Sequence, residues 1–164
     1  MRCAVMAAFS QSGQADPPGS SGSDADAAAR PRIRHRVLVV DDEADVRETL
    51  ADILEGDGYL VDSVESGRAA IERLRGNDYS VVLCDLRMAD IDGMAFYHHV
   101  KASAPALAER TILVTGDILN ARINAFLAEN QVTCIEKPFF PKDVRRVVAE
   151  TLTNRRTLPP AAVS

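Results

Sequence analysis

The sequence predicts an α/β fold in which an open, parallel, five-stranded sheet lies between two layers of helices. Between residues 36 and 153, five short apolar runs alternate with longer amphipathic segments, the pattern expected of repeated strand–helix units. The runs are continuously apolar rather than alternating, so each strand is expected to be covered on both faces. Right-handed crossover connections then place the five strands in one parallel sheet.

The apolar runs give the five predicted strands in order. They are VLVV at 37–40, YLV at 59–61, SVVLC at 80–84, TILVT at 111–115 and VTCI at 132–135. Each is followed by a segment in which apolar and polar residues are mixed, and this segment predicts the helix of the same unit.

Apolar residues at helical spacing identify the faces that the predicted helices bury. They are Val46, Leu50, Ile53 and Leu54 in the first helix, Phe96 and Val100 between residues 92 and 103, Ile118, Ile123, Phe126 and Leu127 after Gly116, and Val144, Val147, Val148 and Leu152 in the last. Glycines at 56, 58 and 76 lie where helices are expected to stop.

The two ends of the chain differ in composition from the predicted domain at 36–153. Residues 1–35 are rich in Ser, Gly, Asp, Ala and Pro without an apolar period, which predicts a disordered tail or linker. The RPRIRHR stretch at 30–36 is interpreted as a solvated basic junction in preference to a nucleic-acid or membrane patch. Residues 154–164 are predicted to form a flexible C-terminal tail.

The overall composition excludes several classes of protein. The 164-residue chain has a formal net charge of −5 and a pI near 5.2, so no nucleic-acid binding by this chain is expected. No apolar run approaches the roughly 20 residues that span a membrane. The cysteines, Cys3, Cys84 and Cys134, are odd in number and lack metal-site spacing, which favours a reducing, cytoplasmic location over a disulfide framework.

Polar and charged residues follow four of the five predicted strands. Asp41 and Asp42 follow the first, Asp85 the third and Lys137 the fifth, while Thr115 ends the fourth. Because open parallel sheets bind their ligands beyond the carboxyl ends of the strands, these side chains are expected to converge at one rim. Taken singly, the aspartates have an ordinary explanation as helix caps or turn residues, Thr115 as a strand residue and Lys137 as a solvated charge; together they predict a site.

The charges of this rim indicate what it binds. Two carboxylates about 4 Å apart repel by about 4 kcal/mol at an effective dielectric constant of about 20, so three aspartates need a counter-charge. A divalent cation with oxygen ligands supplies it, and Mg²⁺ suits such a site best. An acidic cluster with Mg²⁺, a lysine and a hydroxyl can stabilise a phosphoryl group in transfer, and an aspartate can accept it covalently.

Four motifs in order resemble one known family. VLVVDDE, DLRMADIDG, LVTG and EKPF are similar to those of the receiver domain of two-component response regulators, over about residues 36–153. The resemblance implies a flavodoxin-like three-layer sandwich with strand order 2-1-3-4-5 and five helices. TGDIL together with CIEKPF is most similar to receivers attached to hybrid histidine kinases.

The resemblance also assigns roles to the acidic residues. It implies that Asp85 is the phosphoacceptor and that Mg²⁺ is the cofactor. Asp42 and Asp85 would ligate the ion, together with the backbone carbonyl of Arg87, and Asp41 would act through water.

The remaining implied roles concern the phosphoryl group. Lys137 and Thr115 would contact its oxygens, and the peptide bond before Pro138 would be cis. Arg87 and Asp117 would tune the rate at which water reaches the acyl phosphate. The sequence leaves open whether their side chains form a surface ion pair or are two separate solvated charges.

The sequence departs from the family pattern at two positions. Cys134 stands where an aromatic residue is usual, three residues before Lys137, which puts the usual Thr–aromatic switch in doubt. Ala89 stands where Pro is common, which predicts a less stiff loop after the acceptor.

The predicted function is that of a stand-alone phosphoacceptor receiver, not an enzyme beyond its own phosphorylation and autodephosphorylation. The implied partners are a sensor or hybrid histidine kinase, a histidine phosphotransfer protein, or both, with a homodimer through the last two strand–helix units as an option. Two alternatives stay open. One is an interaction module of the same fold that works without phosphate, and the other is a small Mg²⁺ phosphohydrolase, against which Arg87 counts because such enzymes usually have Asp there.

Overall fold

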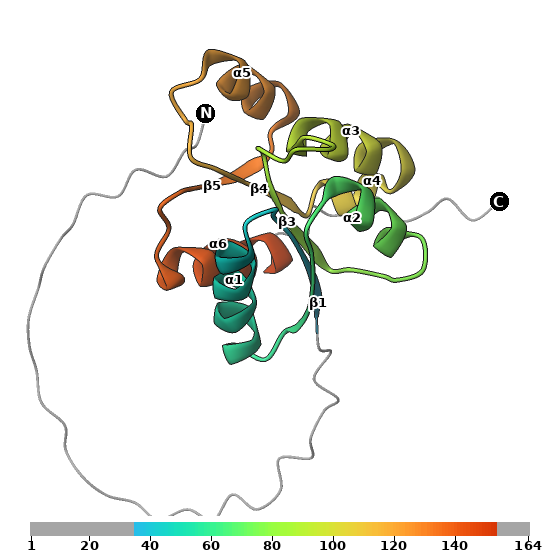
Figure 1. The fold of residues 1–164 in the computed structure, drawn as a ribbon, viewed down its shortest axis with the longest axis vertical. Coiled ribbons are helices and arrows are strands. Elements are labelled where there is room, and N and C mark those ends of the chain that lie inside the picture. The colour runs from blue at the N-terminus through green and yellow to red at the C-terminus, as the bar shows by residue number, and fades with distance from the viewer. Residues whose placement is uncertain (1–34, 154–164) are drawn as a thin grey trace, which may run out of the picture. The chain divides into compact units, whose positions relative to one another are not determined.

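The computed structural model describes residues 35–153, and these residues form the α/β fold that the sequence predicts. Five parallel strands make one sheet in the order β2-β1-β3-β4-β5, with helices on both faces (Figure 1). Apart from His35, the predicted tails at 1–35 and 154–164 lie outside the described residues.

Strands and helices alternate along the described chain. The strands are β1 (Arg36–Val40), β2 (Leu60–Val64), β3 (Val81–Asp85), β4 (Thr111–Thr115) and β5 (Thr133–Glu136). The helices are α1 (Ala44–Gly56), α2 (Gly67–Leu74), α3 (Gly93–Ser103), α4 (Pro105–Ala108), α5 (Ala121–Asn130) and α6 (Pro141–Thr153).

The prediction of five helices is wrong by one, since residues 35–153 contain six. The additional helix, α4, is a single turn that begins directly after α3. Pro105 lies at its first position, where the missing backbone N–H removes no helical hydrogen bond. A helix this short has too few apolar residues to show a period in the sequence.

The second strand also differs from its prediction. YLV at 59–61 predicts a strand that stops before Asp62, whereas β2 runs from Leu60 to Val64. Pairing with β1 explains the extension, because Val40 lies opposite Val64 in the register. Asp62 accepts a hydrogen bond of 2.7 Å from Tyr79 and pairs with Arg36 at 2.9 Å, so its charge is satisfied within the fold.

Each face of the sheet is covered by its own helices. Val37 and Val39 of β1 belong to a core cluster with residues of α1 and α6, whereas Leu38 and Val40 belong to a second cluster with residues of α2, α3, α4 and α5. Figure 1 shows α1 beside α6 on one side of the sheet and the other four helices on the opposite side. This two-sided burial is the reason that the central strands are continuously apolar.

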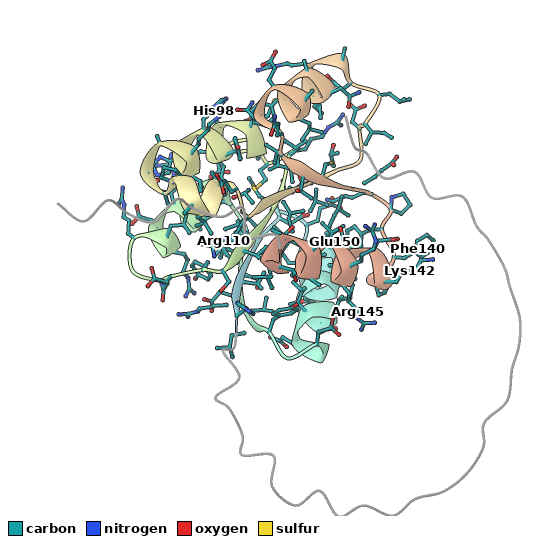
Figure 2. The ribbon with its side chains drawn as sticks, turned by 180° about the vertical axis from the view of Figure 1, so that it is seen from behind. His98, Arg110, Phe140, Lys142, Arg145 and Glu150 are labelled. Atoms are coloured by element: carbon teal, nitrogen blue, oxygen red, sulfur yellow. The ribbon has the colours of Figure 1, made fainter. Side chains whose placement is uncertain are left out.

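Exposed side chains lie just before α6 and in its first turns, and Figure 2 labels three of them. Phe140 is 65% exposed, and the Lys142 ammonium lies 5.7 Å from the centre of its ring. Arg145 pairs with Asp57 at 3.1 Å, which connects α6 to the end of α1. Within residues 35–153, every helix is too short or too polar to cross a bilayer.

Candidate functional site

The carboxyl ends of the central strands bring the predicted site residues to one rim of the sheet. Asp41 directly follows β1, Asp85 is the last residue of β3, Thr115 is the last of β4, and Lys137 directly follows β5. The parallel register aligns these ends, since Asp85 lies opposite Val114 and Thr115 opposite Glu136. Residues up to 96 positions apart in the sequence are therefore neighbours in space.

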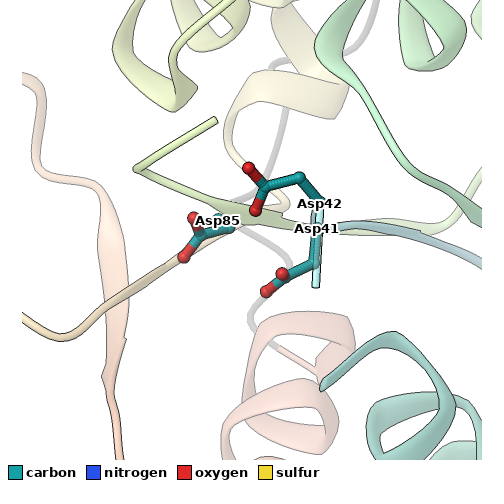
Figure 3. A group of neighbouring side chains, drawn as sticks. All are labelled: Asp41, Asp42 and Asp85. Atoms are coloured by element: carbon teal, nitrogen blue, oxygen red, sulfur yellow. The ribbon is translucent and has the colours of Figure 1, made fainter. Parts of the chain in front are cut away.

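Three carboxylates form the acidic part of the site. Asp41, Asp42 and Asp85 each offer an oxygen, and these atoms lie within 4.8 Å of one another. Figure 3 shows them at the ends of β1 and β3. Asp41 and Asp85 are buried, with 1% and 4% of their surface exposed, whereas Asp42 is exposed. The cluster thus has a buried base and one member open to solvent.

Lys137 supplies the counter-charge to this cluster. Its Nζ lies 2.9 Å from Asp41 Oδ2 and 3.0 Å from Asp85 Oδ1, and 3.4 Å from Glu43 Oε1. Burial alone would lower the pKa of the ammonium, but the hydrogen bonds to Asp41 and Asp85 outweigh it and raise the pKa above its usual range. Lys137 is therefore held in its charged form.

The environment of Asp85 shifts the pKa of its carboxyl upward. Burial raises the pKa of this carboxyl above its ordinary value, and the hydrogen bond and charge of Lys137 offset the effect only in part. The charge of Asp41 raises the pKa further, and the hydrogen bond from the Arg87 N–H lowers it. The neighbouring groups therefore compensate the negative charge of Asp85 only in part.

Backbone N–H groups fix the orientation of the polar side chains. The Glu43 N–H donates to Asp41 Oδ1 at 2.9 Å, and the Arg87 N–H donates to Asp85 Oδ2 at 2.8 Å. The buried Thr115 hydroxyl accepts from the Asp117 N–H at 3.1 Å. The site is therefore largely preorganised.

The donor set is of the kind that binds a hard divalent cation. The three clustered side chains present only carboxylate oxygens, and Mg²⁺ prefers oxygen ligands and retains several waters. Asp42 is open to solvent, so water has access to the same place. Asp42 and Asp85 are thus suited to ligate such an ion directly.

A cleft of about 470 Å³ adjoins the acidic cluster. Asp42 and Arg87 line it near the strand ends, and Met88, Asn120 and Arg122 are among the residues farther along its wall. Arg87 forms an ion pair with Asp117, which lies in the connection after β4. Of the two alternatives that the sequence left open, an ion pair or two separate solvated charges, the structure shows the ion pair. Because Arg87 is 70% exposed at its side chain, this pair contributes little stability.

Several other predicted features take clear positions. The peptide bond between Lys137 and Pro138 is cis. Cys134 is half-buried in β5. Cys84 is buried beside Asp85, and burial raises the pKa of its thiol well above the usual value, as expected of a core residue.

Two residues of the site were missed by sequence reasoning. Glu43 adds a third carboxylate to Lys137, and the third acidic letter of DDE was its only signal. Gly93 lies so close to the end of β3 that an added Cβ would be 2.5 Å from the Asp85 carbonyl oxygen. The Asp-Gly pair at 92–93 marks this position, but it is equally typical of a turn.

The raised pKa of Asp85 predicts a specific pH dependence of stability. A carboxyl whose pKa is higher in the folded state stabilises the fold when protonated, and this stabilisation is lost as pH rises through the folded pKa. In a metal chelator, Asp85→Asn is therefore expected to gain stability over wild type as pH rises above the ordinary aspartate pKa. Urea unfolding across pH measures the difference, and a constant offset would contradict the prediction.

Comparisons with known proteins agree with this geometry. The family model for the response regulator receiver domain matches residues 37–149. The chain is 44% identical over 71 residues to the transcriptional regulatory protein ZraR of Escherichia coli K12, covering 43% of this chain and only 16% of ZraR. It is 29% identical over 117 residues to the rice two-component response regulator ORR5 (Oryza sativa subsp. japonica), covering 71% of this chain and 87% of ORR5.

A solved structure is similar over the same region. It is the response regulator TrrA of Thermotoga maritima in complex with Mg²⁺ and BeF, at a TM-score of 0.63 and 26% identity. The similarity covers 72% of this chain and 99% of TrrA. The region that the family model matches, residues 37–149, includes the whole acidic rim.

Proposed function

The chain belongs to the response regulator receiver domain family of two-component systems, and from this premise we propose that it is a phosphorylatable switch with Asp85 as the phosphoacceptor. Receiver domains accept phosphoryl groups, and histidine kinases or phosphotransfer proteins are their partners. One observation carries the assignment to Asp85. Its carboxylate lies 3.0 Å from the Lys137 ammonium and clusters with Asp41 and Asp42. Asp41 shares the contact with Lys137, at 2.9 Å, and the place of Asp85 at the start of the DLRMADIDG motif distinguishes the two.

The proposed reaction transfers a phosphoryl group from a phosphohistidine of the partner to Asp85. A carboxylate oxygen of Asp85 forms a bond to phosphorus as the bond between phosphorus and the imidazole nitrogen breaks, and the imidazole leaves with the electron pair and takes up a proton. Asp42, Asp85 and the Arg87 carbonyl would hold Mg²⁺, with Asp41 acting through water, and the ion would supply positive charge to neutralise the phosphoryl oxygens.

Two side chains of the rim have proposed roles toward the phosphoryl oxygens. Lys137, held charged by its neighbours, pairs with one oxygen as negative charge accumulates. The Thr115 hydroxyl donates a hydrogen bond to another; its O–H is available for this because the bond from the Asp117 N–H uses only a lone pair of the oxygen. Arg87 lines the cleft beside the site, and its ion pair with Asp117 is proposed to limit the approach of water.

The mass of the intact protein tests the phosphoacceptor. Wild type, Asp85→Asn and Asp78→Asn are incubated with Mg²⁺ and a small acyl-phosphate donor. Asp78 precedes the amino end of β3 and is exposed, so its variant controls for loss of an aspartate outside the site. We expect one phosphoryl adduct on wild type and Asp78→Asn, and none on Asp85→Asn or without Mg²⁺.

Two other outcomes identify the competing functions. A wild type that takes no adduct while still folded indicates an interaction module that works without phosphate, which the replacement of the usual aromatic by Cys134 favours. Rapid turnover of unrelated phosphate esters indicates a phosphohydrolase. The similarity to hybrid-kinase receivers, the homodimer and the cytoplasmic location stay predictions.

A further inference from the structure

The connection between β3 and α3 is attached to the start of α2 by Asp90. This residue lies five positions after Asp85, and its two carboxylate oxygens accept hydrogen bonds from the Gly67 N–H at 3.2 Å and the Arg68 N–H at 3.0 Å. These N–H groups begin α2 and have no partner within the helix. Burial alone would raise the pKa of Asp90, but the backbone donors, Ile91 first among them, outweigh it and lower the pKa.

A second contact connects the same two segments. A Cβ added to Gly67 would lie 2.9 Å from both the Cβ and the carbonyl oxygen of Ile91, so the backbones are in close approach. Ile91 also packs against the core on this face of the sheet. Two successive residues of the connection, Asp90 and Ile91, are therefore held against one point on α2.

The held connection contains the backbone of the proposed metal site. It begins at Leu86, whose N–H donates to the Val114 carbonyl at 2.9 Å, and ends at Gly93, whose N–H donates to the Leu86 carbonyl at 3.1 Å. Between these ends lie the Arg87 N–H, which binds Asp85, and the Arg87 carbonyl. Ala89 lies in the middle of the connection, at the position where Pro is common in the family, so no proline ring restricts the backbone there.

We propose that Asp90 is a positioning residue for the magnesium site, acting through the backbone of Arg87. This inference rests on the proposed function. By fixing residues 90 and 91 on α2, the carboxylate limits the conformations of the connection and holds the Arg87 carbonyl in place beside Asp85. Outer partners that orient the ligands of a metal raise its affinity in this way.

The simplest competing explanation is that Asp90 only caps α2. The helix offers a matched control, because the Ser66 hydroxyl accepts from the Ala69 N–H at 3.1 Å in the same first turn and does not involve the connection. Ser66→Ala therefore removes a cap from α2 and leaves the attachment of the connection in place. A second competing explanation is the negative charge of Asp90, which Asp90→Asn removes while keeping one acceptor oxygen.

The dissociation constant for Mg²⁺, measured on the full chain by NMR titration of the backbone amides, separates these explanations. We expect Asp90→Ala to raise the constant about tenfold, the lower end for an outer partner, and Asp90→Asn to raise it about threefold. Ser66→Ala is expected to bind Mg²⁺ as wild type does. The Arg87 amide should shift in Asp90→Ala before any Mg²⁺ is added, and it should not shift in Ser66→Ala.

Each of the other possible results contradicts either the inference about Asp90 or the proposed function. Equal losses in Asp90→Ala and Ser66→Ala would reduce Asp90 to a helix cap, and equal losses in Asp90→Ala and Asp90→Asn would assign the effect to charge. Unchanged affinity in Asp90→Ala, with wild type binding Mg²⁺, overturns the inference alone. A wild type that does not bind Mg²⁺ overturns the proposed function instead.

Discussion

Lys137→Met is expected to lose about 3 kcal/mol of unfolding free energy at neutral pH in a metal chelator, near the lower end for removing one partner of a buried charge pair. The variant leaves two carboxylates, Asp41 and Asp85, buried without the ammonium that contacts both at about 3 Å. The lower end applies because Lys137 is 19% exposed at its side chain and Asp42 opens the cluster to solvent and counter-ions.

The loss in Lys137→Met should depend on pH. Without the ammonium, the pKa of Asp85 in the folded state rises further above its ordinary value, so protonation relieves the repulsion in acid. Stability is then lost as pH rises through that folded pKa, and the deficit is expected to be smaller at about pH 5 than at about pH 8. Urea unfolding at both values measures it.

Two further variants control this result. Lys142→Met removes a lysine whose described contact is the exposed ring of Phe140, and it is expected to change stability by less than about 0.5 kcal/mol. Adding Asp85→Asn to Lys137→Met should recover part of the loss, because one of the two unpaired charges is gone. A loss below about 0.5 kcal/mol in Lys137→Met would contradict the role of Lys137 as the counter-charge of the cluster.

Gly93→Ala is expected to destabilise the fold by about 1–3 kcal/mol and to weaken Mg²⁺ binding at the same time. The added Cβ would lie 2.5 Å from the Asp85 carbonyl oxygen and 2.8 Å from the Leu86 Cα. Both are backbone atoms of β3 and the connection that follows it, so relief of the clash requires movement of the segment that holds Asp85 and Arg87. Urea unfolding and an Mg²⁺ titration by NMR measure the two effects.

Gly56→Ala is the matched control for Gly93→Ala. Gly56 is also helical, at the end of α1, and a Cβ there would meet no atom within 4 Å. Alanine has the higher helix propensity, so this variant is expected to be neutral or more stable by up to about 1 kcal/mol. If Gly93→Ala retained both wild-type stability and wild-type Mg²⁺ affinity, the close approach at Gly93 would not constrain the site.

The sequence predicted most of the fold because burial and periodicity are local signals. Continuous apolar runs such as TILVT identified strands, and the spacing of Val144, Val147 and Val148 identified the buried face of the last helix. The single turn α4 and the full length of β2 escaped prediction. One is too short to have a period, and the other is extended by pairing with β1, which no local pattern encodes.

The site divides in the same way between what the sequence determined and what only tertiary structure decided. The sequence determined which residues follow the strands, Asp41, Asp85 and Lys137 among them. It also predicted that they meet, because parallel strands bring their carboxyl ends to one rim. Tertiary structure alone decided which contacts they make. The bond of Glu43 to Lys137 and the attachment of Asp90 to α2 join segments distant in the chain, and such contacts depend on how helices and loops pack over the sheet.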